Sequence, residues 1–222
     1  MDYIAWANQY KKRIAREFIR QAGFLPSDTP TGIYTAGLPG AGKTEFTVEL
    51  LKGVSNNLVR IDMDEIAQYI EGYKPEIAYK FRGGASIILS KIYDEVIKAK
   101  IDFVFDGTFS HGRAIENVER ALHHGYTVKI YYIHQDPILA WGFTKDRELV
   151  EHRAIDREGF IDTYLKLEQN IRNLSKEYKN VTISLIVKDA QNKEGRRMED
   201  VKDLFTELPE FLTREQLEDV IK

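Results

Sequence analysis

The sequence predicts an α/β protein of three layers, in which helices cover both faces of a mainly parallel, five-stranded sheet. Two observations predict this class. Short apolar segments alternate with helical segments along the chain, which is the order of β-α-β crossovers. The apolar segments are also nearly continuous in hydrophobic residues, as expected for strands buried on both faces.

The predicted elements follow in chain order. Strands are expected at residues 32–36, 57–61, 103–105, 128–133 and 181–187. Helices between and after them are expected at residues 45–51, 65–70, 85–98, 113–124 and 160–178. The helix at 85–98 has the strongest pattern, because Ile88, Ile92 and Val96 recur at helical spacing.

We expect the 222 residues to form a single domain. An N-terminal helix over residues 1–23 is predicted by the apolar stripe of Tyr10, Ile14 and Phe18. The core should cover about residues 30–190, after a turn-rich segment at 26–32. A C-terminal helical extension is expected at 198–222, where Thr213 and Gln216 have the spacing of a capping box.

The composition excludes several classes of protein. A formal net charge of −3 provides no basic field, so no nucleic-acid partner is expected. The absence of cysteine excludes disulfides, thiolate metal sites and cysteine nucleophiles. The first residues lack the apolar run of a signal peptide, and no segment approaches the ~20 apolar residues of a membrane span. We therefore expect a cytoplasmic protein with no membrane partner.

A phosphate-binding loop (P-loop) follows the first predicted strand. Residues 37–44 read Gly-Leu-Pro-Gly-Ala-Gly-Lys-Thr and match the pattern G-x-x-x-x-G-K-[ST]. Glycines let backbone N–H groups surround a phosphate, and the following helix directs its positive dipole end at the same group. The predicted nucleotide-binding residues are Gly37, Gly40, Ala41, Gly42, Lys43 and Thr44.

Two side chains of this loop have specific predicted roles. Lys43 is expected to bridge the β- and γ-phosphates, and the Thr44 hydroxyl to bind Mg²⁺. ATP is favoured over GTP because the chain has no Asn-Lys-x-Asp motif for reading guanine. A P-loop alone does not separate a kinase from a nucleotide-dependent switch ATPase, but three further features favour a kinase.

Carboxylates provide the first two of these features. Asp62 and Asp64 follow the second predicted strand, and Asp106 follows the third. The carboxyl ends of parallel strands form the ligand-binding edge of such a sheet. Asp62 or Asp64 can accept the proton of an attacking hydroxyl or help to position Mg²⁺, unless it only caps the next helix. Asp106 is expected to orient Mg²⁺ through its water shell, unless it is a turn residue before Gly107.

Arginines provide the third feature. Arg147, Arg153 and Arg157 cluster after the fourth predicted strand. Their guanidinium groups can neutralise charge that develops on a transferring γ-phosphate. The alternative is a charged surface helix. We expect one or two of the three arginines to be functional.

Taken together, these motifs resemble those of the zeta toxin family, P-loop kinases of bacterial toxin–antitoxin systems. The resemblance rests on residues 36–44, 61–64 and 105–108 with Arg147 and Arg153, and covers roughly residues 30–190. It implies an ATP- and Mg²⁺-dependent kinase with Asp64 as the general base. The implied catalytic residues are Lys43, Asp64, Arg147 and Arg153, the metal-binding residues Thr44 and Asp106, and the acceptor-binding residues Asp62, Asp64, Asp106 and Thr108.

The resemblance also implies an acceptor and a partner. Family members phosphorylate the 3′-hydroxyl of UDP-N-acetylglucosamine and are inhibited by a small helical antitoxin. Two positions depart from the family pattern, because Asp106 replaces a glutamate and Ser90 stands where the family has an acid that contacts the sugar nucleotide. The alternatives are therefore a kinase for an NAD-type dinucleotide, a nucleotide, a nucleic-acid end or an antibiotic, and a switch ATPase.

Overall fold

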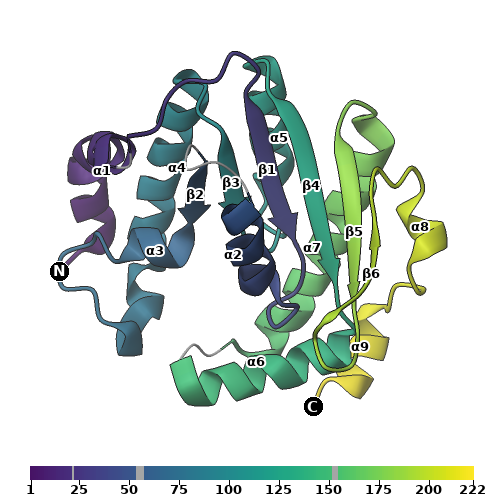
Figure 1. The fold of residues 1–222 in the computed structure, drawn as a ribbon. Coiled ribbons are helices and arrows are strands. Elements are labelled where there is room, and N and C mark those ends of the chain that lie inside the picture. The colour runs from purple at the N-terminus through teal and green to yellow at the C-terminus, as the bar shows by residue number, and fades with distance from the viewer. Residues whose placement is uncertain (22, 54–57, 152–154) are drawn as a thin grey trace.

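The sheet of this protein has the predicted parallel arrangement. The computed structural model describes residues 1–21, 23–53, 58–151 and 155–222. Its strands are β1 (Thr31–Ala36), β2 (Val59–Asp62), β3 (Phe103–Asp106), β4 (Thr127–His134), β5 (Thr182–Lys188) and β6 (Glu194–Met198). They form one sheet in the order β2-β3-β1-β4-β5-β6 (Figure 1). The first five pair in parallel, so their carboxyl ends lie at the same edge.

The sheet has six strands rather than the five predicted. The additional strand, β6, pairs antiparallel with β5 at the edge of the sheet. Its sequence is Glu-Gly-Arg-Arg-Met and its residues are mostly exposed, so it lacks the apolar pattern by which a strand is predicted. Charged side chains are common on edge strands because they discourage pairing with other chains.

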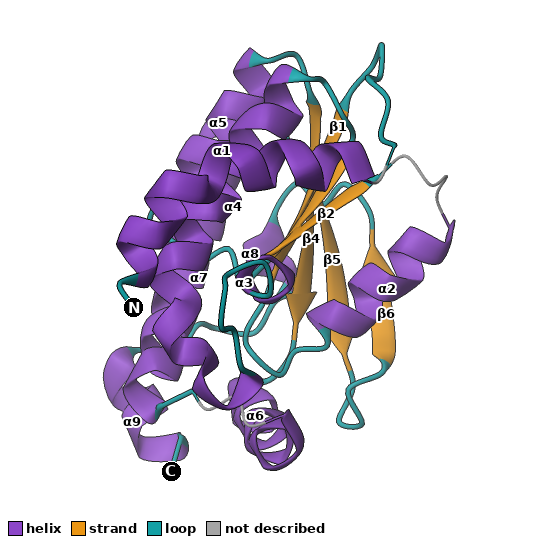
Figure 2. Cartoon of the chain, turned by 90° about the vertical axis from the view of Figure 1, so that its left-hand side faces the viewer, coloured by secondary structure: helices purple, strands orange, loops and turns teal. Residues whose placement is uncertain are grey.

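Helices cover both faces of the sheet. They are α1 (Tyr3–Gln21), α2 (Lys43–Gly53), α3 (Met63–Ala67), α4 (Arg82–Lys98), α5 (Ala114–His123), α6 (Pro137–Glu151), α7 (Arg157–Glu177), α8 (Leu204–Glu207), α9 (Arg214–Val220) and the 3₁₀-helix η1 (Pro75–Phe81). Figure 2 shows α1, α4, α5 and α7 on one side of the sheet and α2 on the other. Helix α6 crosses near the carboxyl ends of the strands (Figure 1). No helix among the described residues is both long enough and apolar enough to cross a bilayer.

A polar contact in the core joins β1 to two of the covering helices. The hydroxyl oxygens of Tyr34 on β1 and Tyr93 on α4 lie 2.6 Å apart. Both hydroxyls also contact the backbone carbonyl of Asn117 on α5. Both tyrosines are buried, and buried hydroxyls need such partners to offset the loss of water. The contact therefore fixes α4 and α5 relative to the central strand.

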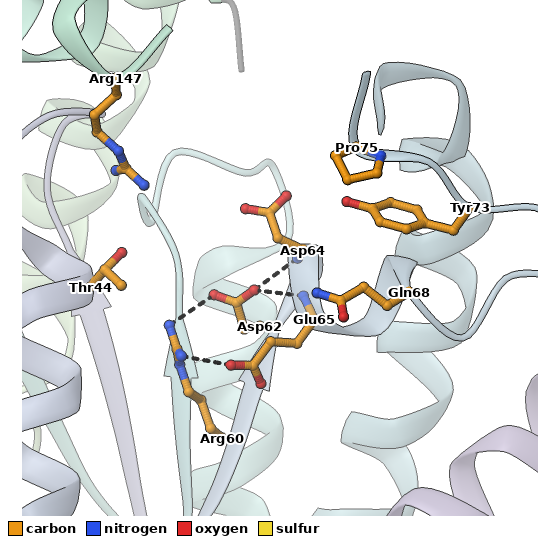
Figure 3. A pocket seen from close by; sticks show the side chains of 9 residues that line it. All are labelled: Thr44, Arg60, Asp62, Asp64, Glu65, Gln68, Tyr73, Pro75 and Arg147. Atoms are coloured by element: carbon orange, nitrogen blue, oxygen red, sulfur yellow. Dashed lines mark hydrogen bonds and ion pairs between the residues drawn. The ribbon is translucent and has the colours of Figure 1, made fainter. Parts of the chain in front are cut away.

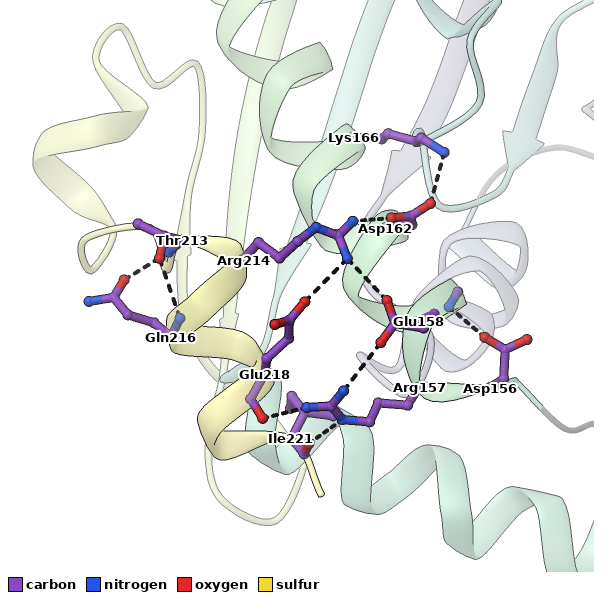
Figure 4. Close-up of polar contacts among 11 residues, drawn as sticks. Asp156, Arg157, Glu158, Asp162, Lys166, Thr213, Arg214, Gln216, Glu218 and Ile221 are labelled. Carbon is purple, nitrogen blue, oxygen red and sulfur yellow. Dashed lines mark hydrogen bonds and ion pairs between the residues drawn. The ribbon is translucent and has the colours of Figure 1, made fainter.

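Helix α9 is bonded to α6 and α7 through its last turn. The predicted capping box of Thr213 and Gln216 is confirmed at its start. Arg157, the first residue of α7, donates from Nε to the carbonyl of Ile221 at 2.7 Å, and from Nη2 to the carbonyl of Glu218 (Figure 4). Trp141 of α6 donates from Nε1 to the carbonyl of Lys222 at 2.8 Å. Arg157 therefore satisfies the carbonyls at the end of a helix, which is a structural role.

We predict that Arg157→Ala destabilises the protein more than Arg214→Ala. Loss of Arg157 removes two charge-assisted bonds to carbonyls, at a cost of about 1–3 kcal/mol. Arg214 forms exposed ion pairs with Glu158 and Asp162 (Figure 4), and such pairs contribute little. Thermal unfolding of both variants measures the difference. An equal or larger loss in the Arg214 variant would contradict the assignment.

Candidate functional site

The P-loop lies between the end of β1 and the start of α2, as the motif requires. The N–H of Gly37 donates to the carbonyl of Thr108 at 3.3 Å, which joins the loop to the segment after β3. Lys43 donates from Nζ to the carbonyl of Leu38 within the loop at 2.6 Å. Burial lowers the pKa of Lys43 to about 8, although the negative charge of Asp106 opposes this shift. An anion bound next to this lysine would therefore stabilise its charged form.

The backbone of helix α6 packs against the P-loop at Gly40. A Cβ atom on Gly40 would lie 2.2 Å from the carbonyl oxygen of Ala140 on α6, and the φ angle of Gly40 is +79°. Both observations require glycine at this position. The phosphate loop therefore rests directly on the backbone of α6.

Two acidic residues lie side by side at the ends of β2 and β3. The strand register pairs Asp62 with Asp106, and adjacent like charges destabilise a sheet unless a cation lies between them. Arg60 supplies that cation, because its Nη2 lies 3.2 Å from Asp62 Oδ2 and 2.7 Å from Asp106 Oδ2. Its Nη1 also bonds Glu65 Oε1 at 2.7 Å. One guanidinium group thus joins three carboxylates.

Asp106 is held from a second direction. The hydroxyl of Thr35, on β1, lies 2.9 Å from Asp106 Oδ1. The side chain of Asp106 is only 4% exposed. Both of its carboxylate oxygens therefore have protein partners, so its orientation is fixed before any ligand binds.

Asp62 and Asp64 have different environments although they are two residues apart. Oδ1 of Asp62 accepts the backbone N–H groups of Asp64 and Glu65, at 2.8 and 3.0 Å, and so caps α3. Burial raises the pKa of Asp62, while its hydrogen bond to the Glu65 backbone and Arg60 both lower it. The carboxylate of Asp64 points into the cavity, between Arg147 and Tyr73 (Figure 3). Asp62 therefore has the role of a helix cap, whereas Asp64 is the candidate for a functional carboxylate.

A cavity of about 660 Å³ lies at this edge of the sheet. Figure 3 shows Thr44 and Arg147 on one side of it, Tyr73 and Pro75 on the other, and Asp64 between them. The full set of lining residues is Thr44, Arg60, Asp62, Asp64, Glu65, Gln68, Tyr73, Pro75 and Arg147. The end of the P-loop and Asp64 of α3 therefore face one space.

The structure brings only some of the predicted site residues together. Arg147 lies on α6 and lines the cavity with Asp64. Arg153 lies outside the described residues. Thr108 is not among the residues that line the cavity, and its hydroxyl contacts the hydroxyl of Ser110 at 2.6 Å. An acceptor-binding role for Thr108 therefore stays a prediction.

The oxygen donors near Thr44 suit a magnesium ion that is bound mainly by phosphate. Within the described ranges, no group of three or more His, Cys, Asp or Glu residues could hold a metal ion. Mg²⁺ does not need such a group, because it usually keeps waters and binds one or two protein oxygens together with substrate phosphates. The Thr44 hydroxyl provides a donor of this hard type and lines the cavity together with Asp62. Asp106 does not line the cavity and bonds Thr35 and Arg60, so its role at the metal stays a prediction.

Several residues of the site have no motif by which they could be predicted as a group. Arg60 stands two residues before Asp62 on a strand, and side chains at this spacing point to the same face. That spacing could have identified Arg60 as the partner of the acids. Tyr73 and Pro75 belong to the turn and the 3₁₀-helix η1, which have no periodic pattern, and their place in the cavity depends on the tertiary fold.

Comparison with known families gives a clear result. The model of a family described as zeta toxin matches residues 14–200. No curated protein matches the sequence.

Solved structures share the fold at low sequence identity. A structure of the PezAT chromosomal toxin–antitoxin system of Streptococcus pneumoniae is 17% identical with a TM-score of 0.67, and the match covers 96% of this chain and 87% of that one. The AvrRxo1-ORF1:-ORF2 complex with ATP is 14% identical with a TM-score of 0.54, covering 89% and 64%. The Pnkp1/Rnl/Hen1 RNA repair complex is 13% identical with a TM-score of 0.52, covering 80% and 50%.

We predict that Gly40→Ala weakens the binding of phosphate-bearing ligands by at least about tenfold, because the added Cβ must displace the loop from α6. Gly142→Ala is the matched control. Gly142 lies two residues beyond Ala140 on the same helix, and a Cβ there meets no atom within 4 Å. That variant should keep binding and gain up to about 1 kcal/mol of helix stability. Calorimetric titration and thermal unfolding check both results, and unchanged binding by the Gly40 variant would contradict the contact.

Proposed function

Because the chain belongs to the zeta toxin family, whose members are P-loop kinases, we propose that it transfers the γ-phosphate of ATP to a hydroxyl group of a small acceptor. One observation supports this proposal most strongly. The end of the P-loop, a cationic side chain and a carboxylate face one cavity, at Thr44, Arg147 and Asp64. This arrangement suits a reaction between a bound phosphate and a second molecule better than a switch, which needs no acceptor space.

The P-loop side of the cavity would bind ATP. The backbone N–H groups of Gly40, Ala41 and Gly42 would surround its phosphates, and Lys43 would leave the Leu38 carbonyl to contact them. Mg²⁺ would be held by the Thr44 hydroxyl and the phosphates, where it would neutralise charge on the β- and γ-phosphate oxygens.

The opposite side would bind the acceptor. Asp64 would take the proton from the acceptor hydroxyl as its oxygen forms a bond to the γ-phosphorus and the bond to the β-phosphate oxygen breaks, leaving ADP. Arg147 would stabilise the charge on the transferring group, and we assign the same role to Arg153. Asp62 and Asp106, which bond Arg60, would position Asp64 and the waters of the metal.

The acceptor that we propose first is UDP-N-acetylglucosamine. The wall formed by Tyr73, Pro75 and Gln68 offers an aromatic face and an amide to a ring-bearing ligand. The same wall suits an NAD-type dinucleotide, a nucleotide or an antibiotic, which remain the alternative acceptors. We also propose a small helical antitoxin as a partner, which is supported by the PezAT relative being part of a toxin–antitoxin system.

A phosphorylation assay tests the proposed function. Purified protein is incubated with Mg²⁺, γ-labelled ATP and a panel of UDP-N-acetylglucosamine, other nucleotide sugars, nicotinamide dinucleotides and oligonucleotide ends. We expect label on one acceptor, and a loss of about 10²–10⁴-fold in kcat for Asp64→Asn. Glu71→Gln, which changes an exposed carboxylate of the turn after α3, is the control and should retain activity. Full activity in the Asp64 variant would eliminate it as the base, and release of free phosphate alone would favour the switch ATPase.

Lys43 gives the proposed ATP site a pH dependence. Its pKa is lowered to about 8 without ligand, and bound phosphates would raise it, so binding near pH 8 should take up about half a proton. ATP affinity should therefore fall as the pH rises above 8, by up to about tenfold per pH unit. Titration calorimetry in buffers of different ionisation enthalpy measures the uptake. Lys43→Arg keeps the charge at all these pH values, so an equal uptake in that variant would contradict the assignment to Lys43.

A further inference from the structure

The turn between β5 and β6 lies directly against the P-loop. Nδ2 of Asn192 donates to the carbonyl of Gly40 at 3.1 Å. Gln135, which follows β4, donates from Nε2 to the carbonyl of Asp189 at 2.9 Å and to Oδ1 of Asn192 at 3.2 Å. Figure 1 shows this hairpin turn beside the loop that follows β1. The hairpin is therefore a wall of the phosphate site that sequence patterns did not predict.

Internal hydrogen bonds fix the shape of the turn. Oδ1 of Asp189 accepts the N–H groups of Gln191 and Lys193, both at 2.9 Å. The N–H of Asn192 donates to the carbonyl of Asp189 at 3.0 Å. The residue before the turn, Lys188, therefore projects from a rigid support.

Lys188 places an ammonium group on the P-loop. Its Nζ lies 3.3 Å, and its Cε 3.2 Å, from the position that a Cβ atom on Gly42 would occupy. Gly42 is the loop residue directly before Lys43, so the two lysines approach the loop from different elements.

The neighbouring carboxylates of the hairpin are bonded to other groups. Across the part of the chain that the structure describes, the side chain of Lys188 forms no hydrogen bond or ion pair. Glu194 is its partner in the strand register but bonds Arg197 at 2.8 Å. Asp189 directs Oδ1 into its own turn. Lys188 therefore adds to the positive potential of Lys43, the loop N–H groups and the N-terminus of α2.

We propose that Lys188 is a second phosphate-binding lysine, which contacts the α- or β-phosphate of the bound nucleotide from the hairpin. This inference rests on the proposed function, since it requires a nucleotide in the P-loop. Lys188 reaches the loop at Gly42 and does not line the cavity with Asp64, and we therefore assign it to a phosphate that precedes the transferred one. A polyphosphate is the ligand class that several convergent cations and N–H groups recognise.

Binding measurements on matched variants test this assignment. Lys188→Met removes the ammonium group, and Lys193→Met removes an exposed lysine from the same hairpin. We expect Lys188→Met to bind ATP and ADP about tenfold more weakly, since one charge-assisted hydrogen bond is lost. Adenosine, which has no phosphate, should bind this variant as it binds the wild type. Lys193→Met should bind all three ligands unchanged, and Lys188→Arg should restore most of the affinity for ATP.

Each other outcome has a distinct meaning. Wild-type affinity for ATP in Lys188→Met would overturn the role of Lys188 while leaving the proposed kinase intact. An equal loss for adenosine would also overturn it, because the lysine would then support the hairpin or the base rather than phosphate. Failure of the wild-type protein to bind ATP would overturn the proposed function, and this inference with it. Circular dichroism and the melting temperature of each variant establish that the fold is retained.

Discussion

The site depends on the contact of Arg60 with the two acids that end β2 and β3. Parallel pairing puts Asp62 beside Asp106 in the strand register, where two largely buried carboxylates would repel each other. Arg60 removes this conflict because it bonds both acids and Glu65. Breaking such a buried pair typically costs about 3–5 kcal/mol, since it leaves a charge without a partner. Arg60 on β2 therefore stabilises the two acids at this edge of the sheet.

This contact also separates the tasks of Asp62 and Asp64. Both oxygens of Asp62 have protein partners, because Oδ2 bonds Arg60 and Oδ1 caps α3. Capping starts the helix directly after the strand and so determines where its first turn lies. Asp64 is in that first turn and projects into the cavity towards Arg147 (Figure 3). The position of Asp64, the proposed base, thus depends on the bonds that Asp62 forms with Arg60 and with the start of α3.

Much of this arrangement could be predicted from the sequence, because it depends on local patterns. Each of these features is a short segment of the sequence with a recognisable pattern. This holds for the P-loop, for the parallel strands and for the acids that follow them. The edge strand β6, the guanidinium of Arg60 and the wall at Tyr73 could not be predicted in this way. They consist of polar or aperiodic residues whose roles arise only when distant segments meet, as Asn192 and Gly40 do across the hairpin contact. Arg153 lies outside the described residues, so its predicted role is untested.

Long-range contacts also give a structural role to the C-terminal residues, for which the sequence alone predicted no role. The P-loop rests on α6, because Gly40 closely approaches the carbonyl of Ala140. The next residue of α6, Trp141, donates to the carbonyl of Lys222, and Arg157 bonds the last turn of α9. Helix α9 therefore supports the helix on which the phosphate loop lies, and α6 also carries Arg147 into the cavity. A well-packed interior transmits small displacements rather than absorbing them, so the position of α9 constrains both the loop and the arginine.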